Sequence, residues 1–318
     1  MTSPLRLQRN LPRRALVAAG LVAAAVALAG CGSTIADRMP TAAGGLPDTM
    51  TRLAAVKITE ILGQQVVVDN RPGAGGIAAC ELVANSTPDG YSLLIPDVAQ
   101  TAINPALYAK LPYDTLRDFA PVTLMGTSAQ FLTANASVPA NSLKELIALV
   151  KARPGQMSYG SGGIGSVHHL SMEALKTPLG LNIVHVPYKG NGVAIPAMSS
   201  GEGALVFSAL PAIEGHLKVG RVKLLAVNTL KRSPQAPNVP TVGEVTGIQD
   251  YDYPPAIGVL APAKTPKAVI NKLAAAIAKA VHHPDVAGRY VTLGIEPVGN
   301  TPAQYLAQTR VDIAKYAK

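Results

Sequence analysis

The sequence predicts an α/β protein built on mostly parallel sheets. Short apolar runs rich in β-branched residues alternate with segments whose apolar residues recur at helical spacing, such as Leu143, Leu146 and Val150. Pro and Gly mark the ends of these segments, as at Pro88-Asp89-Gly90. An alternation of strands with helices is typical of sheets whose neighbouring strands run parallel.

The expected elements follow one another along the whole chain after the N-terminal region. Strands are expected at residues 65–68, 92–95, 121–125, 131–133, 157–159, 183–186, 203–207, 222–227 and 256–260. Helices are expected at residues 49–62, 76–85, 142–153, 166–175, 194–199, 213–219, 267–282 and 302–318.

The first thirty residues have the pattern of an export signal. Four Arg precede an apolar run over residues 15–30, and no acidic residue comes before it. This run is shorter than the roughly 20 residues of a membrane-spanning helix, so residues 1–30 are predicted to be a removable signal peptide. The Arg13-Arg14 pair permits the twin-arginine route, although the general secretion route fits the segment better.

Residues 28–31, Leu-Ala-Gly-Cys, match the lipobox of bacterial lipoproteins, in which the cysteine is acylated and becomes the new N-terminus. We therefore expect lipid on Cys31 and an exported, periplasmic protein anchored to a membrane. The alternative is an ordinary cleavage site beside an incidental cysteine. With Cys31 acylated, Cys80 is the one cysteine left, so no intramolecular disulfide is expected.

Composition excludes several classes of partner. Residues 1–30 contain four Arg and no acid, so their removal turns 28 basic and 19 acidic residues into 24 and 19, a formal charge of +5. This charge suits small anions and is too weak and evenly spread for nucleic acid. An aromatic content of 4% without Trp argues against a cleft that stacks sugars or bases. About 290 mature residues suit two ordinary domains or one large one.

Three glycine-containing stretches stand at the ends of expected strands: residues 70–76 (NRPGAGG), 159–170 (YGSGGIGSVHHL) and 185–190 (HVPYKG). A Gly-rich turn from strand to helix lets backbone N–H groups approach an anion, and the helix N-terminus adds partial positive charge. Each charge-assisted hydrogen bond to a carboxylate contributes roughly 1.5 to 3 kcal/mol. A few such bonds reach the ~8 kcal/mol of a micromolar complex without an Arg clamp.

Enzyme functions fit poorly. The second stretch also spells G-x-G-x-x-G, but a dinucleotide site needs an acid about 20 residues later, where the chain has His185, Tyr188 and Lys189. A hydrolase would need a G-x-S-x-G turn or an acid partner for the nearby Ser and His residues, and neither is recognisable. The His168-His169 and His282-His283 pairs lack the i, i+4 spacing of a helical metal site. We expect no enzyme activity, cofactor or metal.

Together with INPALY at 103–108, LPYD at 111–114, DF at 118–119 and PTVGE at 240–244, these stretches resemble, in order and spacing, the Bug family, the extracytoplasmic receptors of tripartite tricarboxylate transporters. The resemblance implies a two-lobed clamshell of the periplasmic-binding-protein type that captures a small carboxylate for a membrane transporter. It places lobe one at residues 37–124 and 254–318, and lobe two at 125–253, with crossing strands near 122–124 and 257–259.

The resemblance also implies a ligand site at the facing loops. On lobe one, Gly44 and Gly45 with Asp48 match the Pro-Gly-Gly-x-x-Asp turn of the family, with Ala43 in place of Pro. The expected ligand-binding residues are Gly44, Gly45, Asp48, Gly75, Gly76, Ser161, Gly162, Gly165, Ser166, His169 and Ser208. The alternative is that the glycines only permit tight turns and that Asp48 and Ser166 only cap helices.

The chain departs from the family at its first strand and in the expected cleft. Residues 32–43 contain no apolar run, so the first strand of lobe one is expected to be degenerate or missing. Asp97 and Gln100 replace small hydroxyl-type residues, and Ser208 stands where Asp is frequent. The expected function is a monomeric, lipid-anchored carboxylate receptor for a transporter. The alternative is a lipid-anchored sensory or interaction protein on the same scaffold.

Overall fold

The computed structural model describes residues 34–40, 46–71 and 74–317. The predicted signal peptide, Cys31 and the Gly44-Gly45 pair lie outside the described residues.

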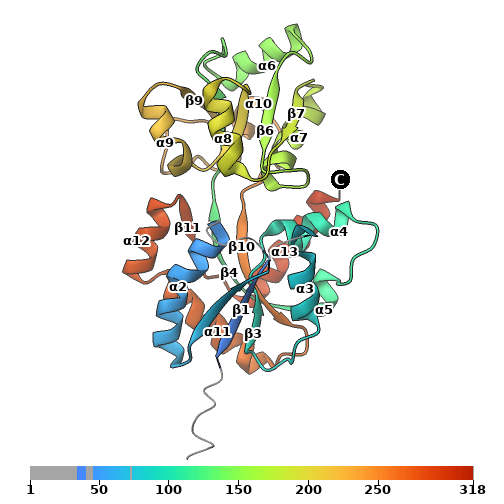
Figure 1. The fold of residues 1–318 in the computed structure, drawn as a ribbon, viewed down its shortest axis with the longest axis vertical. Coiled ribbons are helices and arrows are strands. Elements are labelled where there is room, and N and C mark those ends of the chain that lie inside the picture. Colours follow the sequence, from blue (N-terminus) through green and yellow to red (C-terminus); the bar gives the residue numbers. More distant parts are fainter. Residues whose placement is uncertain (1–33, 41–45, 72–73, 318) are drawn as a thin grey trace, which may run out of the picture.

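The described chain forms two sheets, each covered by helices (Figure 1). The six-stranded sheet has the order β11-β4-β10-β3-β1-β2, and we call it, with its helices, lobe one. The five-stranded sheet has the order β7-β6-β8-β5-β9 and forms lobe two. The strands of lobe one are β1 (Ile35–Met39), β2 (Val66–Asn70), β3 (Ser92–Leu94), β4 (Phe119–Ser128), β10 (Ala256–Pro262) and β11 (Ile295–Pro297). Those of lobe two are β5 (Phe131–Asn135), β6 (Ser158–Ser161), β7 (Val184–Pro187), β8 (Leu205–Ser208) and β9 (Val222–Val227).

Both sheets are mixed, so the prediction of mostly parallel sheets is wrong. Parallel pairing joins β1 to β2 and β3, and β6 to β7 and β8. The other pairs are antiparallel: β10 with β3 and β4, β11 with β4, and β5 with β8 and β9. The chain enters lobe two through β4 and returns through β10, so these two long neighbours run in opposite directions.

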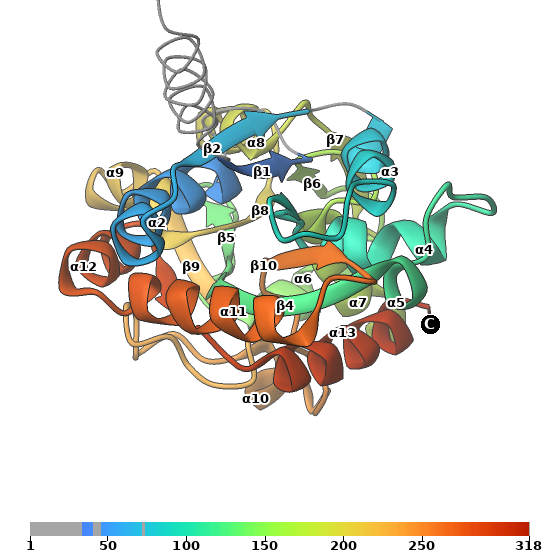
Figure 2. The same cartoon turned by 90° about the horizontal axis from the view of Figure 1, so that it is seen from below.

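Helices cover both faces of the lobe-one sheet. One face carries α2 (Leu46–Leu62), α11 (Lys267–Val281) and α12 (Pro284–Thr292), and the other carries α3 (Ile77–Ala84) and α13 (Pro302–Tyr316). Both α11 and α13 lie beside β4 (Figure 2). Shorter turns complete the lobe: η1 (Ala74–Gly76), η2 (Ala99–Ile103), α4 (Asn104–Leu107) and α5 (Thr115–Asp118).

Lobe two repeats this sandwich. Side chains of α6 (Leu143–Ala152), α7 (Val167–Leu179) and α10 (Val242–Thr246) pack in the apolar cluster of one face, and those of α8 (Asn191–Ser200) and α9 (Leu210–Lys218) pack in the cluster of the other. In α6 the apolar positions that predicted the helix, Leu143, Leu146 and Val150, are all buried. The helical spacing therefore identified the buried face.

The first strand is present, and the prediction that it is missing or degenerate is wrong. β1 is a central strand that pairs with β2 on one side and with β3 on the other. Ile35, Asp37 and Met39 point into buried surroundings, and an ion pair joins Arg38 to Asp69 of β2. Backbone pairing on both edges thus holds a segment that has no apolar run, because the ladder bonds do not depend on side-chain polarity.

Two chain segments connect the lobes where β4 leads into β5 and where the chain returns to β10 (Figure 1). They lie side by side: the Ser128 N–H donates to the Pro255 carbonyl over 3.0 Å. The Asn228 side chain accepts from the Gln130 N–H (2.9 Å) and donates to the Tyr253 carbonyl (2.7 Å). One side chain thereby fixes both connections to lobe two.

The lobes also touch beside the connections. Val167 and Leu170 of α7 pack with η2 of lobe one and with Ile313 and Tyr316 of α13. The Tyr316 ring meets the Tyr253 ring edge to face at 5.6 Å between centroids. The C-terminal helix therefore links the lobe-one sheet to the inner surface of lobe two.

Candidate functional site

A cavity of about 830 Å³ lies between the two sheets. Its walls come from both lobes and from the connection at Gln130. The lobe-one wall consists of Leu46, Pro47, Thr49, Asp97, Ala99, Pro255, Ile257 and Leu293. The lobe-two wall consists of Gly162, Ser166, Val167, His168, Gly190, Asn191, Gly192, Ile195, Ser208, Ala209, Pro211 and Ala212. The volume lies in the range of small-molecule sites, which commonly form at domain interfaces.

Three helices of lobe two begin at this cavity. Ser166 caps α7, and its Oγ accepts the His169 N–H over 3.3 Å. The helices α8 and α9 begin after Gly190 and Ala209 without any side-chain cap. None of the three helices carries an acidic residue in its first turn. Their N-terminal N–H groups and dipoles therefore give this wall a positive potential that suits a carboxylate.

Glycine brings two of these helix starts together. Gly163 and Gly165 have φ of 121° and 76°, values that favour glycine, and they turn the chain from β6 into α7. A Cβ on Gly162 would lie 3.4 Å from the Asn191 nitrogen and 3.5 Å from the Gly190 Cα. The loop before α7 thus lies directly against the start of α8.

Two buried polar atoms on the lobe-two wall have no hydrogen-bond partner among the described residues: His168 Nδ1 and Asn191 Oδ1. The Asn191 amide is oriented by its Nδ2, which donates to the Phe207 carbonyl over 2.9 Å. Burial lowers the pKa of His168 to about 4, so its imidazole is neutral at pH 7. Since buried polar groups are normally hydrogen-bonded, both atoms are available to a ligand in the cavity.

The lobe-one wall has a different character. Asp97 follows β3, and its Oδ1 accepts the Ala99 N–H over 2.6 Å. Burial raises the pKa of the Asp97 carboxyl group. Pro47 and Thr49, from the start of α2, line the same wall with Ile257 of β10 and with Leu293, which follows α12.

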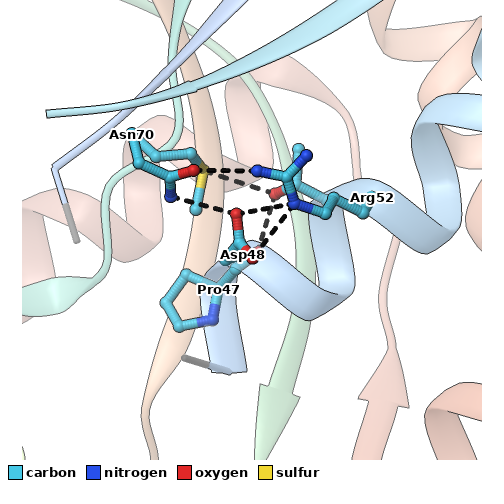
Figure 3. Close-up of polar contacts among 6 residues, drawn as sticks. Pro47, Asp48, Arg52 and Asn70 are labelled. Carbon is cyan, nitrogen blue, oxygen red and sulfur yellow. Dashed lines mark hydrogen bonds and ion pairs between the residues drawn. The ribbon is translucent and has the colours of Figure 1, made fainter. Parts of the chain in front are cut away.

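Gly162, Ser166 and Ser208 are the expected ligand-binding residues that line the cavity. Asp48 is not part of its lining. The Asp48 carboxylate accepts two bonds from Arg52 Nε, at 3.0 and 3.1 Å, and one from Asn70 Nδ2 at 3.0 Å (Figure 3). Asp48 therefore connects the first turn of α2 to the end of β2.

Gly75 and Gly76 also lie outside the lining. The Gly75 carbonyl accepts from Gln100 Nε2 (3.1 Å) and Asn104 Nδ2 (3.0 Å), so this turn supports η2 from behind. Gly165 lies against lobe one, because a Cβ there would come within 2.9 Å of Leu107 Cδ2. These three glycines support the elements around the cavity.

Ser161 and His169 belong to a cluster behind the loop. Ser161 is fully buried, and its Oγ lies 2.7 Å from His185 Nε2. The His185 ring stacks between Tyr159 and His169, with centroid distances of 4.7 and 4.3 Å. Burial lowers the pKa of both imidazoles. These contacts hold the loop of residues 161–166 in place.

The Ser161–His185 pair is not a hydrolytic site. Ser161 does not line the cavity, and its Oγ also accepts the Gly163 N–H over 3.1 Å. Glu173, the acid that interacts electrostatically with His185, accepts from Tyr159 (2.5 Å) and Lys176 (2.6 Å). A buried Ser that does not reach the cavity, and whose His has no hydrogen-bonded acid among the described residues, cannot act on a solute there.

Sequence reasoning missed Gly190 and Asn191 as cavity residues, and it placed Asp97 in the cleft only through the family resemblance. Gly190 ends the third glycine stretch and precedes α8, so the strand–Gly–helix pattern that identified Ser166 was also present there. Asp97 carried no such pattern.

In the described part of the chain no helix is long and apolar enough to cross a membrane. No group of His, Cys, Asp and Glu in that part could hold a metal ion.

Known proteins match this chain over most of its length. Residues 50–317 match the tripartite tricarboxylate transporter family receptor. A UPF0065 protein of Bordetella pertussis is 37% identical over 261 residues, which cover 81% of this chain and 80% of the relative. BugT of the same organism is 34% identical over 280 residues, 88% of this chain and 86% of the relative.

Solved structures agree with these relatives. Rpa4515 of R. palustris with adipate has a TM-score of 0.79 at 32% identity and covers 89% of this chain and 94% of its own. MatC of Rhodopseudomonas palustris with bound malate has a TM-score of 0.77 at 29% identity, with 89% and 97% covered. The periplasmic binding protein BugD has a TM-score of 0.76 at 31% identity, with 89% and 95% covered. The two-lobed fold and this match together establish that the chain belongs to the tripartite tricarboxylate transporter family receptors, which are periplasmic solute-binding proteins and not enzymes.

Proposed function

We propose that this protein binds a small carboxylate in the cavity between its lobes and delivers it to the membrane subunits of a tripartite tricarboxylate-type transporter. The observation that carries the proposal is the convergence of three helix N-termini without acidic first turns on one wall of an 830 Å³ cavity. Adipate and malate, named with two related structures, are carboxylates of a size that such a cavity holds.

In the proposed complex, the carboxylate accepts hydrogen bonds from backbone N–H groups at the starts of α7, α8 and α9. Ser166 keeps the first turn of α7 in place. Asn191 Nδ2 donates to the Phe207 carbonyl, so its Oδ1 is left to accept a hydrogen bond from a donor group of the ligand. A few charge-assisted hydrogen bonds of roughly 1.5 to 3 kcal/mol each supply the affinity. Gly44 and Gly45 extend the site from lobe one in this proposal.

The proposed lobes comprise residues 37–124 with 254–318, and residues 125–253. The lobes close about the two connecting segments and bury the ligand. The membrane subunits distinguish the closed, ligand-bound form from the open, empty form. The protein acts as a monomer, exported to the periplasm after loss of residues 1–30 and anchored through lipid on Cys31. Loss of fatty-acid labelling in a Cys31→Ala variant would support the anchor, and retained labelling would refute it.

Ligand binding is tested by thermal-shift screening and calorimetry with small mono-, di- and tricarboxylates, with sugars and cations as controls. A ligand that binds the native state raises its melting temperature with dose. The double variant Ser166→Ala, Gly162→Val is expected to bind at least tenfold more weakly.

Ser142→Ala is the matched control. Ser142 caps α6 through the Glu145 N–H (3.2 Å) in the same lobe and does not line the cavity. It should lower the melting temperature without changing affinity. Equal affinity in the double variant and the wild type would place the ligand elsewhere, and a cooperative melt that no carboxylate shifts would favour a sensory or interaction role.

A further inference from the structure

The cavity has opposite electrostatic character on its two walls. Among its described lining residues, Asp97 is the one Asp or Glu, and neither Lys nor Arg occurs. His168 on the opposite wall is neutral at pH 7, because burial lowers its pKa to about 4. A carboxylate therefore faces a wall of helix N-termini across the ligand space.

The helix starts strengthen this contrast. On the lobe-two wall, α7, α8 and α9 have no acid in their first turns. On the lobe-one wall, α2 carries Asp48 in its first turn, where a carboxylate offsets the positive end of the helix. Because Arg52 pairs with Asp48, Asp97 is the charge that distinguishes the lobe-one wall of the cavity.

Asp97 has no cationic partner in the described protein. Its carboxylate accepts from the backbone N–H groups of Ala99 and Gln100, which are neutral donors. The ionisable side chains that interact electrostatically with it are Cys80, Tyr305 and Tyr316, and burial raises the pKa of all three. They are uncharged at pH 7. A partly buried carboxylate normally pairs with a cation. Asp97 faces the cavity, so a bound ligand can supply that cation.

We propose that Asp97 selects an amino-carboxylate ligand, a small carboxylate that also carries a protonated amine. The carboxylate binds at the helix starts of lobe two, and the ammonium donates to Asp97 on lobe one. This inference rests on the proposed carboxylate-binding function. A dicarboxylate with its second charge toward Asp97 meets a like charge in a partly desolvated site and binds more weakly.

The test compares ligands that share a spacer and differ at one end: 4-aminobutanoate, glutarate and butanoate, with alanine and propanoate as an α-amino pair. Binding to the purified protein is measured by calorimetry at pH 7. Each amino-carboxylate is expected to bind at least tenfold more tightly than its partner without the amine. The Asp97→Asn variant should abolish that ratio while binding butanoate and glutarate at least as well as the wild type.

Asp97→Asn separates this role from a purely structural one, because the Asn Oδ1 still accepts the Ala99 N–H while the charge is removed. Asp114→Asn is the matched control: Asp114 accepts the N–H groups of Leu116 and Arg117 at the start of α5, away from the cavity. An unchanged amine preference in Asp97→Asn, or wild-type preference for plain carboxylates, would overturn the inference alone. Failure of every carboxylate to bind, with or without an amine, would overturn the proposed function as well.

Discussion

Asp37 places an ionisable carboxyl group inside the apolar core of lobe one. It lies in the centre of β1, is 3% exposed, and is surrounded by Ile58, Leu93 and Ile277 around a small internal cavity. Burial raises its pKa from 3.8 to about 7. The substitution Asp37→Asn keeps the shape of the side chain and removes its titration.

The size of the effect follows from this pKa. A folded-state pKa above the unfolded value means that the folded protein prefers the protonated acid. The stability it contributes is complete below pH 3.8 and is lost as the pH rises through about 7. A difference of about 3 pH units, at about 1.4 kcal/mol each, gives about 4 kcal/mol. The free energy of unfolding of Asp37→Asn, relative to the wild type, should therefore increase by about 4 kcal/mol between pH 4 and pH 8.

Urea unfolding at several pH values measures this difference, followed by circular dichroism because the chain has no Trp. Glu202→Gln, at an exposed position, is the control and should track the wild type at every pH. A constant offset between Asp37→Asn and the wild type from pH 4 to pH 8 would refute the reasoning, since it would mean that Asp37 ionises in the folded protein as readily as in the unfolded chain.

Three further predictions concern stability. Arg52→Ala removes the cation that pairs with the buried Asp48 and should lower the free energy of unfolding by about 1 to 3 kcal/mol, whereas Arg117→Ala, which breaks an exposed pair with Asp118, should leave the urea unfolding midpoint close to that of the wild type. Gly258→Ala would place a Cβ 1.9 Å from the Tyr305 hydroxyl and should cost about 3 kcal/mol or more; an unchanged melting temperature would show that α13 moves freely. Gly215→Ala, in α9 with no atom within 4 Å of the added Cβ, should gain about 0.5 to 1 kcal/mol, and a loss in thermal unfolding would contradict the open surroundings.

Element positions could be predicted from the sequence where one face of an element is apolar. The helix expected at 267–282 is α11 (Lys267–Val281), whose buried Ile270, Leu273 and Ile277 recur at helical spacing. β1 could not be found in this way, because Asp37 occupies its central buried position and backbone pairing on both sides holds it. Strand direction was also beyond the pattern, since a period of two residues is the same for parallel and antiparallel neighbours.

The site was predicted in part for a similar reason. Ser166 and Gly162 belong to a strand–Gly–helix turn, a local pattern with a known backbone geometry, and both line the cavity. Asp48 is also at a helix start, but its carboxylate bonds to Arg52 and to Asn70 and does not line the cavity. Asn70 lies 22 positions after Asp48 in the chain, so the local sequence could not predict this contact. Asp97 follows a strand without any glycine turn, so no local pattern indicated it, and the family resemblance alone placed it in the cleft.

The paired connections between the lobes restrict the mechanics of the whole molecule. β4 and β10 are paired by hydrogen bonds from Thr127 to Phe119, and sliding one strand past the other would break this register. Asn228 fastens both segments at the exit from lobe two. We therefore expect the lobes to move mainly by bending at these paired segments, so that a small displacement at the cavity becomes a larger one at the far tips, such as the α6 end of lobe two.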